Sequence, residues 1–250
     1  MSDPIKTTNP DGTATYQSMG DRDIAAEAVQ GVAKAAVKLV DAFSNAADMS
    51  ANMPADIREL LRSASSDIKN APDTAFRAKA AADKHLANDM LYPAGRERLA
   101  KQEIGDAMAK VTEILDGADT KIDVADALLY QAARPAMPAG ADVAARSDVK
   151  MVLDAANGLD MADSAKELAK RSDAVGALVA DQGWLSLYMQ SRKVDPRTAD
   201  AIKVIVRNEM LQAAAESDDP KRVATGRTAL ALVNLRKAVI AARGYQRNAL

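Results

Sequence analysis

Apolar residues recur every three or four positions from Asp21 almost to the C-terminal end of the chain. Between Asp21 and about Asp48, the residues Val32, Leu39 and Phe43 fall on one helical face, and charged residues fall on the opposite face. This spacing predicts amphipathic α-helices. No segment alternates apolar and polar residues as a half-buried strand does, so the pattern predicts an all-α fold.

Helix-boundary residues divide the first half of this pattern. Pro54 and Pro72 are each predicted to open a helix, because proline fits the first helical position, where its missing N–H is not needed. A further helix is predicted over residues 94–116, with Gly117 as its C-terminal cap. The segment that starts at Thr120 resembles a capping box, which predicts that another helix begins there.

The second half is divided by similar signals. Residues 135–140 hold two prolines and a glycine and form the best linker candidate. A helix is predicted over residues 141–157, ended by Gly158, and Ser164 suggests a capping box for the next one. A broken helical region is expected around Gly176 and onward.

The last two helices are predicted from the same sequence signal at their N-terminal ends. Asp195-Pro196 and Asp219-Pro220 each place an acidic N-cap before a first-position proline, and Gly244 is expected to close the last helix. We therefore expect about nine helices in one or two alanine-rich bundles, with an extended N-terminal arm. The predicted division is an extended or disordered arm over residues 1–20, an N-terminal helical bundle over 21–134 and a C-terminal helical bundle over 141–250.

The composition changes this picture in two ways. Alanine makes up about a fifth of the 250 residues, which favours helices and lets their axes approach closely. Each alanine buries little area, so we expect a modest monomer core to which subunit contacts add. The net charge of −2 argues against a general nucleic-acid coat or a basic membrane binder, and the lack of cysteine excludes disulfides and thiolate sites.

Targeting signals are absent from the sequence as given. The polar start has no apolar segment of a secretory signal, and no apolar run approaches the ~18 residues that span a bilayer. We expect synthesis in the cytoplasm and a soluble protein, with assembly into a virion as a further option.

Candidate catalytic and metal-binding motifs are weak. His85, the one histidine, lies four residues before Asp89 and could be an oriented base, but no nucleophile accompanies it. The segment Ser66–Lys69 matches an S-x-x-K pattern without the K-T-G and S-D-N elements that accompany it in penicillin-binding enzymes. Aspartates between Asp116 and Asp123 lack the glycine and closing glutamate of a calcium loop. We predict no enzyme activity, no cofactor and no metal site.

Two features are candidates for interfaces. Trp184 and Tyr188 lie one helical turn apart and form either a core plug or an interface anchor. From Pro220 onward the chain has no acidic residue, and its arginines share one helical face in part. That basic stripe is a solvated face, a docking face for acidic subunits or, ranked last, a phosphate-binding face. The candidate interface residues are Trp184, Tyr188, Arg222, Arg236, Arg243 and Arg247.

The sequence favours a non-enzymatic structural or assembly subunit of a larger protein complex. A tailed-phage virion component, such as a head-to-tail connector or a capsid-associated protein, is one example by analogy. The expected partners are protein subunits in a homo-oligomer or hetero-complex. The first alternative is a soluble helical adaptor that binds a partner peptide or helix in a groove. The second is an unrecognised enzyme.

Overall fold

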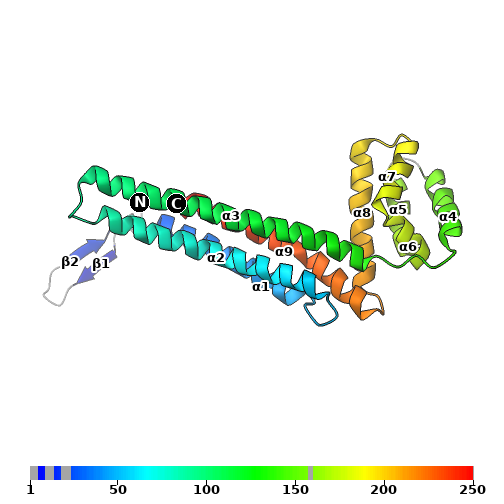
Figure 1. Cartoon of the computed structure of the whole chain (residues 1–250), viewed down its shortest axis with the longest axis horizontal. Coiled ribbons are helices and arrows are strands. Elements are labelled where there is room, and N and C mark those ends of the chain that lie inside the picture. Colours follow the sequence, from blue (N-terminus) through cyan, green and yellow to red (C-terminus); the bar gives the residue numbers. More distant parts are fainter. Residues whose placement is uncertain (1–4, 9–13, 18–23, 157–159, 250) are drawn as a thin grey trace. The chain divides into compact units, whose positions relative to one another are not determined.

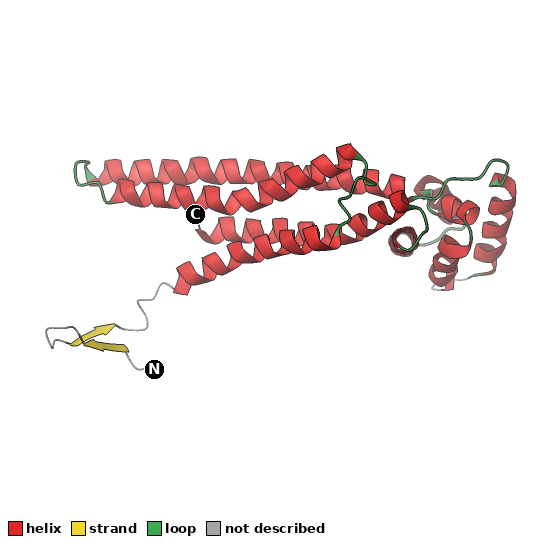
Figure 2. Cartoon of the chain, turned by 90° about the horizontal axis from the view of Figure 1, so that it is seen from below, coloured by secondary structure: helices red, strands yellow, loops and turns green. Residues whose placement is uncertain are grey.

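The computed structural model describes residues 5–8, 14–17, 24–156 and 160–249. Within these ranges the chain forms nine helices, coloured red in Figure 2, and two short strands, coloured yellow. The predicted all-α fold is confirmed. The helices are α1 (Ile24–Ala46), α2 (Ala55–Leu86), α3 (Pro93–Ala133), α4 (Asp142–Ala155), α5 (Asp160–Arg171), α6 (Asp173–Val179), α7 (Gln182–Ser191), α8 (Pro196–Ala215) and α9 (Pro220–Ala249) (Figure 1).

The N-terminal arm contains the two strands. β1 (Ile5–Thr8) and β2 (Ala14–Gln17) pair in antiparallel register, with Ile5 opposite Gln17 and Thr8 opposite Ala14. The sequence pattern predicted an extended arm but no strand pairing. The other residues of the arm lie outside the described ranges.

Four residues that were predicted to mark helix boundaries lie inside helices instead. Pro72 lies inside α2, Gly117 and Thr120 lie inside α3, and Gly244 lies inside α9. Ser164 likewise lies within α5 rather than at its start, whereas the predicted end at Gly158 falls outside the described residues. The count of about nine holds although several individual boundaries do not.

A regular buried stripe explains why the long helices continue. The buried residues of α2 lie alternately four and three positions apart along the sequence. The average of 3.5 residues is the repeat of coiled-coil packing. These residues are Ile57, Leu61, Ala64, Ile68, Ala71, Ala75, Ala78 and Ala82. The stripe crosses Pro72 without a change of register, so burial on both sides outweighs the backbone hydrogen bond that proline removes. The same spacing passes Gly117 in α3, from Leu115 through Ala118 to Ile122.

The chain groups into two compact units whose boundaries differ from the predicted division at residues 135–140. The reason is that long helices bring together segments from both ends of the sequence. Helices α1, α2, α3 and α9 each contribute one part to each unit, whereas α4 to α8 belong to the second unit. Unit 1 comprises residues 1–39, 66–117 and 237–250, and unit 2 comprises residues 40–65 and 118–236.

In unit 1, segments of α1, α2, α3 and α9 lie side by side (Figures 1 and 2). Polar contacts tie α9 to α3. The Gln246 amide donates from Nε2 to the Met108 carbonyl (2.9 Å) and to Thr112 Oγ1 (2.7 Å). Arg243 Nη2 pairs with Asp116 Oδ1 at 2.8 Å.

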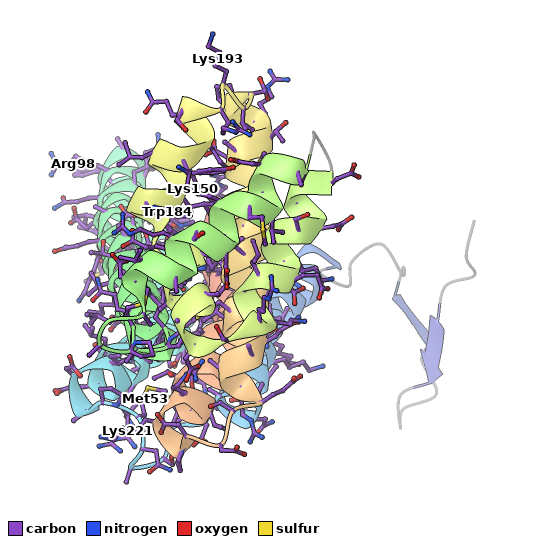
Figure 3. The ribbon with its side chains drawn as sticks, turned by 90° about the vertical axis from the view of Figure 1, so that its right-hand side faces the viewer. Met53, Arg98, Lys150, Trp184, Lys193 and Lys221 are labelled. Atoms are coloured by element: carbon purple, nitrogen blue, oxygen red, sulfur yellow. The ribbon has the colours of Figure 1, made fainter. Side chains whose placement is uncertain are left out.

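In unit 2, helices α4 to α8 enclose an apolar cluster that includes Val149, Leu168, Leu185 and Ile202. Predicted acidic caps start two of its helices. Asp195 accepts the backbone N–H of Thr198 at the start of α8, and Asp219 accepts that of Lys221 at the start of α9. The turn between α7 and α8 contains Lys193 in the left-handed region (φ 54°), with its side chain directed outward (Figure 3).

Candidate functional site

The basic stripe of α9 contacts acidic residues of its own chain. Arg222 pairs with Asp173 (3.4 Å) and donates to the Ala133 carbonyl, and Arg236 pairs with Asp123 at 2.7 Å. Arg243 pairs with Asp116, as described above, whereas Arg247 is exposed. Three of the four predicted interface arginines therefore each pair with an acidic group of their own unit. That they contact another subunit stays a prediction.

Asp126 on α3 joins three helices of unit 2. It accepts hydrogen bonds from Arg207 of α8 and, at 3.1 Å, from Arg236 of α9. The Arg207 guanidinium also lies 5.0 Å from the ring centre of Tyr130, a cation–π distance. Burial lowers the pKa of Arg236, but the hydrogen bond to Asp123 and the charges of Asp126 and Asp123 outweigh it, so the pKa is raised. This junction fixes α8 and α9 against α3.

Trp184 and Tyr188 stack on α7, with ring centres 5.5 Å apart and planes inclined by 13°. Tyr188 is buried, and its hydroxyl donates to Asp154 of α4, whose carboxylate also pairs with Arg192. Desolvation, followed by the hydrogen bond to Asp154 and its charge, raises the pKa of Tyr188 to about 12. The pair is thus anchored in the core by Tyr188, whereas Trp184 is only half-buried.

Trp184 lines a cavity of about 580 Å³ within unit 2. The end of α3 and the segment that follows it form one wall, and α4, α6 and α7 supply the rest. The side chains that give the cavity its chemistry are Arg134, Met137, Asp142, Arg146, Asp181 and Trp184. Sequence reasoning identified Trp184 but not its charged neighbours, three of which, Arg134, Asp142 and Arg146, lie 38 to 50 residues before it in sequence.

The charged groups of this cavity are held in place locally. Arg134 Nη2 donates to the Ala177 carbonyl (3.1 Å) and lies 3.8 Å from Asp181. Asp181 caps α7 by accepting the N–H groups of Gly183 and Trp184. Arg146 donates from Nε to both carboxylate oxygens of Asp142, at 2.8 and 2.9 Å.

A buried carboxylate outside the cavity was missed by the sequence analysis. Glu209 of α8 is 8% exposed and pairs with Lys170 (2.5 Å) and Lys166 (3.3 Å) of α5. The hydrogen bond from Lys170 lowers the pKa of Glu209, against desolvation, and the bond from Lys166 lowers it further. The i,i+4 spacing of the two lysines could have suggested a shared anionic partner.

The turn between α2 and α3 presents apolar side chains from a tightly bonded backbone. Met90 is 93% exposed and Tyr92 is 89% exposed. The Asn88 carboxamide oxygen accepts the Met90 N–H at 3.0 Å. Arg96 donates from Nε to the Leu91 carbonyl (2.9 Å) and pairs through Nη1 with Asp89 (3.0 Å). Polar groups thus fix the turn while two large side chains face outward.

The residues of the weak catalytic motifs lie on α2, on α3 and in the turn between them. His85 is half-buried near the end of α2, and Asp89 pairs with Arg96. Ser66 accepts a hydrogen bond from Asn70 on the exposed side of α2. In the part of the chain that the structure describes, no three potential metal ligands gather, and no helix is long and apolar enough to cross a bilayer.

Comparison with known proteins gives no relative from which a function could be inferred. No protein-family model, no curated protein and no solved structure matches this chain.

Proposed function

We propose that this protein is a structural or assembly subunit of a larger protein complex, and that the α2–α3 turn is one of its contact surfaces. The observation that carries the proposal is the exposure of Met90 and Tyr92 on a turn held rigid by Asn88 and Arg96. A large apolar side chain in water forgoes roughly 1.5–3 kcal/mol of burial free energy. A backbone that is already ordered limits the entropy lost on docking.

The alanine-rich core of unit 1 supports the same proposal. Alanine makes up most of the buried apolar residues described in this unit. Such a core buries little apolar area per helix pair. Contacts with another subunit would therefore add to the stability of the unit. A tailed-phage virion component, as a head-to-tail connector or capsid-associated protein, is one form of this proposal.

The test is the molar mass of two double variants in size-exclusion chromatography with light scattering. Met90→Ser/Tyr92→Ser removes the apolar surface of the turn. Val143→Ser/Met151→Ser is the matched control, because both residues are exposed on α4. We expect the wild type and the control to form a defined complex, alone or with co-purifying subunits, and the turn variant to be monomeric. An unchanged complex in the turn variant would contradict the assigned surface, and a monomeric wild type without companions would contradict the function.

The alternative function, a helical adaptor, is supported by a different observation. The 580 Å³ cavity beside Trp184 combines apolar walls with two arginines and two aspartates. Its volume is that of a site for a small ligand or for one or two residues of a peptide. It is too small to enclose a helix.

A further inference from the structure

We propose that the cavity beside Trp184 binds the C-terminal residue of a partner polypeptide, with the carboxylate at Arg146 and an apolar last side chain at Trp184 and Met137. This inference rests on the alternative adaptor function and does not involve the α2–α3 turn. It is supported by the unused donors of Arg146, the exposed part of Trp184 and the charges of the lining residues.

The Arg146 guanidinium has hydrogen-bond donors that no described residue uses. Its Nε is used by Asp142, and no further hydrogen bond of its guanidinium to the described residues is present. Its side chain is 52% exposed and lines the cavity. A guanidinium binds a carboxylate through two parallel N–H groups, and such charge-assisted bonds are stronger than neutral ones. Asp142 holds the fork in one orientation and so reduces the entropy that a ligand must offset.

The apolar half of the site is equally fixed. One face of the Trp184 ring is covered by Tyr188, and the Tyr188 hydroxyl is bound to Asp154. Trp184 therefore cannot turn easily toward the core, and its accessible surface lines the cavity with half-buried Met137. Indole and thioether groups favour contact with an aliphatic or aromatic side chain.

The charge balance selects a monocarboxylate. Arg134 and Arg146 contribute two positive charges to the lining, and Asp142 and Asp181 contribute two negative ones. A phosphate group carries about −1.5 to −2 charge at pH 7 and would meet two carboxylates here. A single carboxylate is a better match, and the backbone N–H of the same residue can donate to an aspartate. A C-terminal residue joins a carboxylate, an N–H and a side chain within one residue, which fits a cavity of this size.

Trp184 makes the test direct, since it is the single tryptophan of the chain. The probe is N-acetyl-leucine, titrated into the full-length protein while the tryptophan emission is recorded. N-acetyl-leucinamide, which lacks the charge, is the matched ligand. For so small a probe we expect a Kd on the order of 1 mM. The amide should bind at least tenfold more weakly.

Two variants localise the binding. Arg146→Gln keeps a polar side chain but lacks the charged fork, and Arg197→Gln changes an exposed arginine in the same unit that does not line the cavity. We expect Arg146→Gln to weaken binding of the acid at least tenfold and to leave the weak binding of the amide unchanged. Arg197→Gln should bind like the wild type. Helix content measured by circular dichroism checks that both variants are folded.

The possible outcomes distinguish failure of the carboxylate site from failure of the adaptor function. Equal binding of acid and amide, or of wild type and Arg146→Gln, would overturn the carboxylate site, as would an emission spectrum unchanged up to 20 mM, about twenty times the expected Kd. A peptide that binds equally well with a free or an amidated C-terminus would leave the adaptor function in place and remove only this inference.

Discussion

Unit 1 and unit 2 are built on the same four long helices but fill their interiors differently. In the described part of unit 1, Ile68 and Leu115 are the large side chains that are completely buried, and most other core positions are alanine. Unit 2 buries Phe43, Leu61 and Leu129 in the same way, together with the apolar cluster of α4 to α8. The comparison shows that a 3.5-residue repeat sets helix packing in both units, whereas side-chain size sets how much free energy that packing supplies.

The helix glycines give the sharpest way to test the difference. A Cβ added to Gly226 of unit 2 would lie 2.6 Å from the Ala215 nitrogen and 2.7 Å from the Leu211 oxygen, both in the backbone of α8. A Cβ added to Gly117 of unit 1 would have no atom within 4 Å. We expect Gly226→Ala to destabilise the protein by about 3 kcal/mol, because the helices must move apart.

Gly117→Ala is the matched control for this substitution. It should stabilise the protein by about 0.5–1 kcal/mol, because alanine loses less backbone entropy than glycine in a helix. Urea unfolding followed by circular dichroism measures both values. A tolerated methyl group at Gly226 would show that α8 and α9 are not in backbone contact.

Hydrogen exchange tests the comparison across whole segments. Buried residues of α2 from Ala71 to Ala82 are alanines and one proline, and those of α8 include Ile202, Val206 and Met210. Larger side chains bury more area at about 25 cal/mol per Å² and so resist local opening more strongly. We expect amides of residues 71–82 to exchange about 10–100-fold faster than those of residues 202–211. Equal protection measured by mass spectrometry would show that the alanine core gains stability from elsewhere.

The sequence pattern predicted helix content better than helix ends. The apolar repeat is local, so all-α structure could be inferred from it, and the caps at Asp195 and Asp219 follow from adjacent residues. The predictions at Pro72 and Gly117 were wrong because the local cost of each residue is offset by a stripe of its own helix that other helices bury. The strand pair could have been suggested by Pro10-Asp11-Gly12, a turn-forming triplet between the two strands.

The residues of the candidate sites were harder to predict from the sequence than the helix ends, because tertiary structure brings them together. Trp184 was found because large aromatic residues are rare in this chain. Arg146 and Asp181 reach the same cavity only through the path of the chain between α3 and α7. The acidic partners of Arg222, Arg236 and Arg243 lie between 49 and 127 residues away in sequence, and no local pattern indicates them.

The smallest expected effect concerns the ion pairs of Glu209 in unit 2; the buried polar side chain in the described part of unit 1, Gln246, is uncharged. The pKa of Glu209 is lowered from its ordinary 4.5, so the folded state favours the carboxylate. Its contribution to stability is therefore present above pH 4.5 and is lost as the pH falls through the lowered pKa. Both lysines are nearly half exposed, so solvent weakens the pair, and we expect Glu209→Gln to cost only about 1 kcal/mol at pH 7.

The pH dependence distinguishes this ion pair from simple packing. Once the pH has fallen through the lowered pKa of Glu209, the wild type should lose most of its advantage over Glu209→Gln, because a neutral carboxyl and an amide are nearly isosteric. The control Glu167→Gln changes an exposed glutamate on α5 and should have little effect at either pH. A gap between wild type and Glu209→Gln that stays constant in urea unfolding from pH 7 down to the lowest pH at which the protein remains folded would mean that shape, and not charge, makes Glu209 fit between α5 and α8.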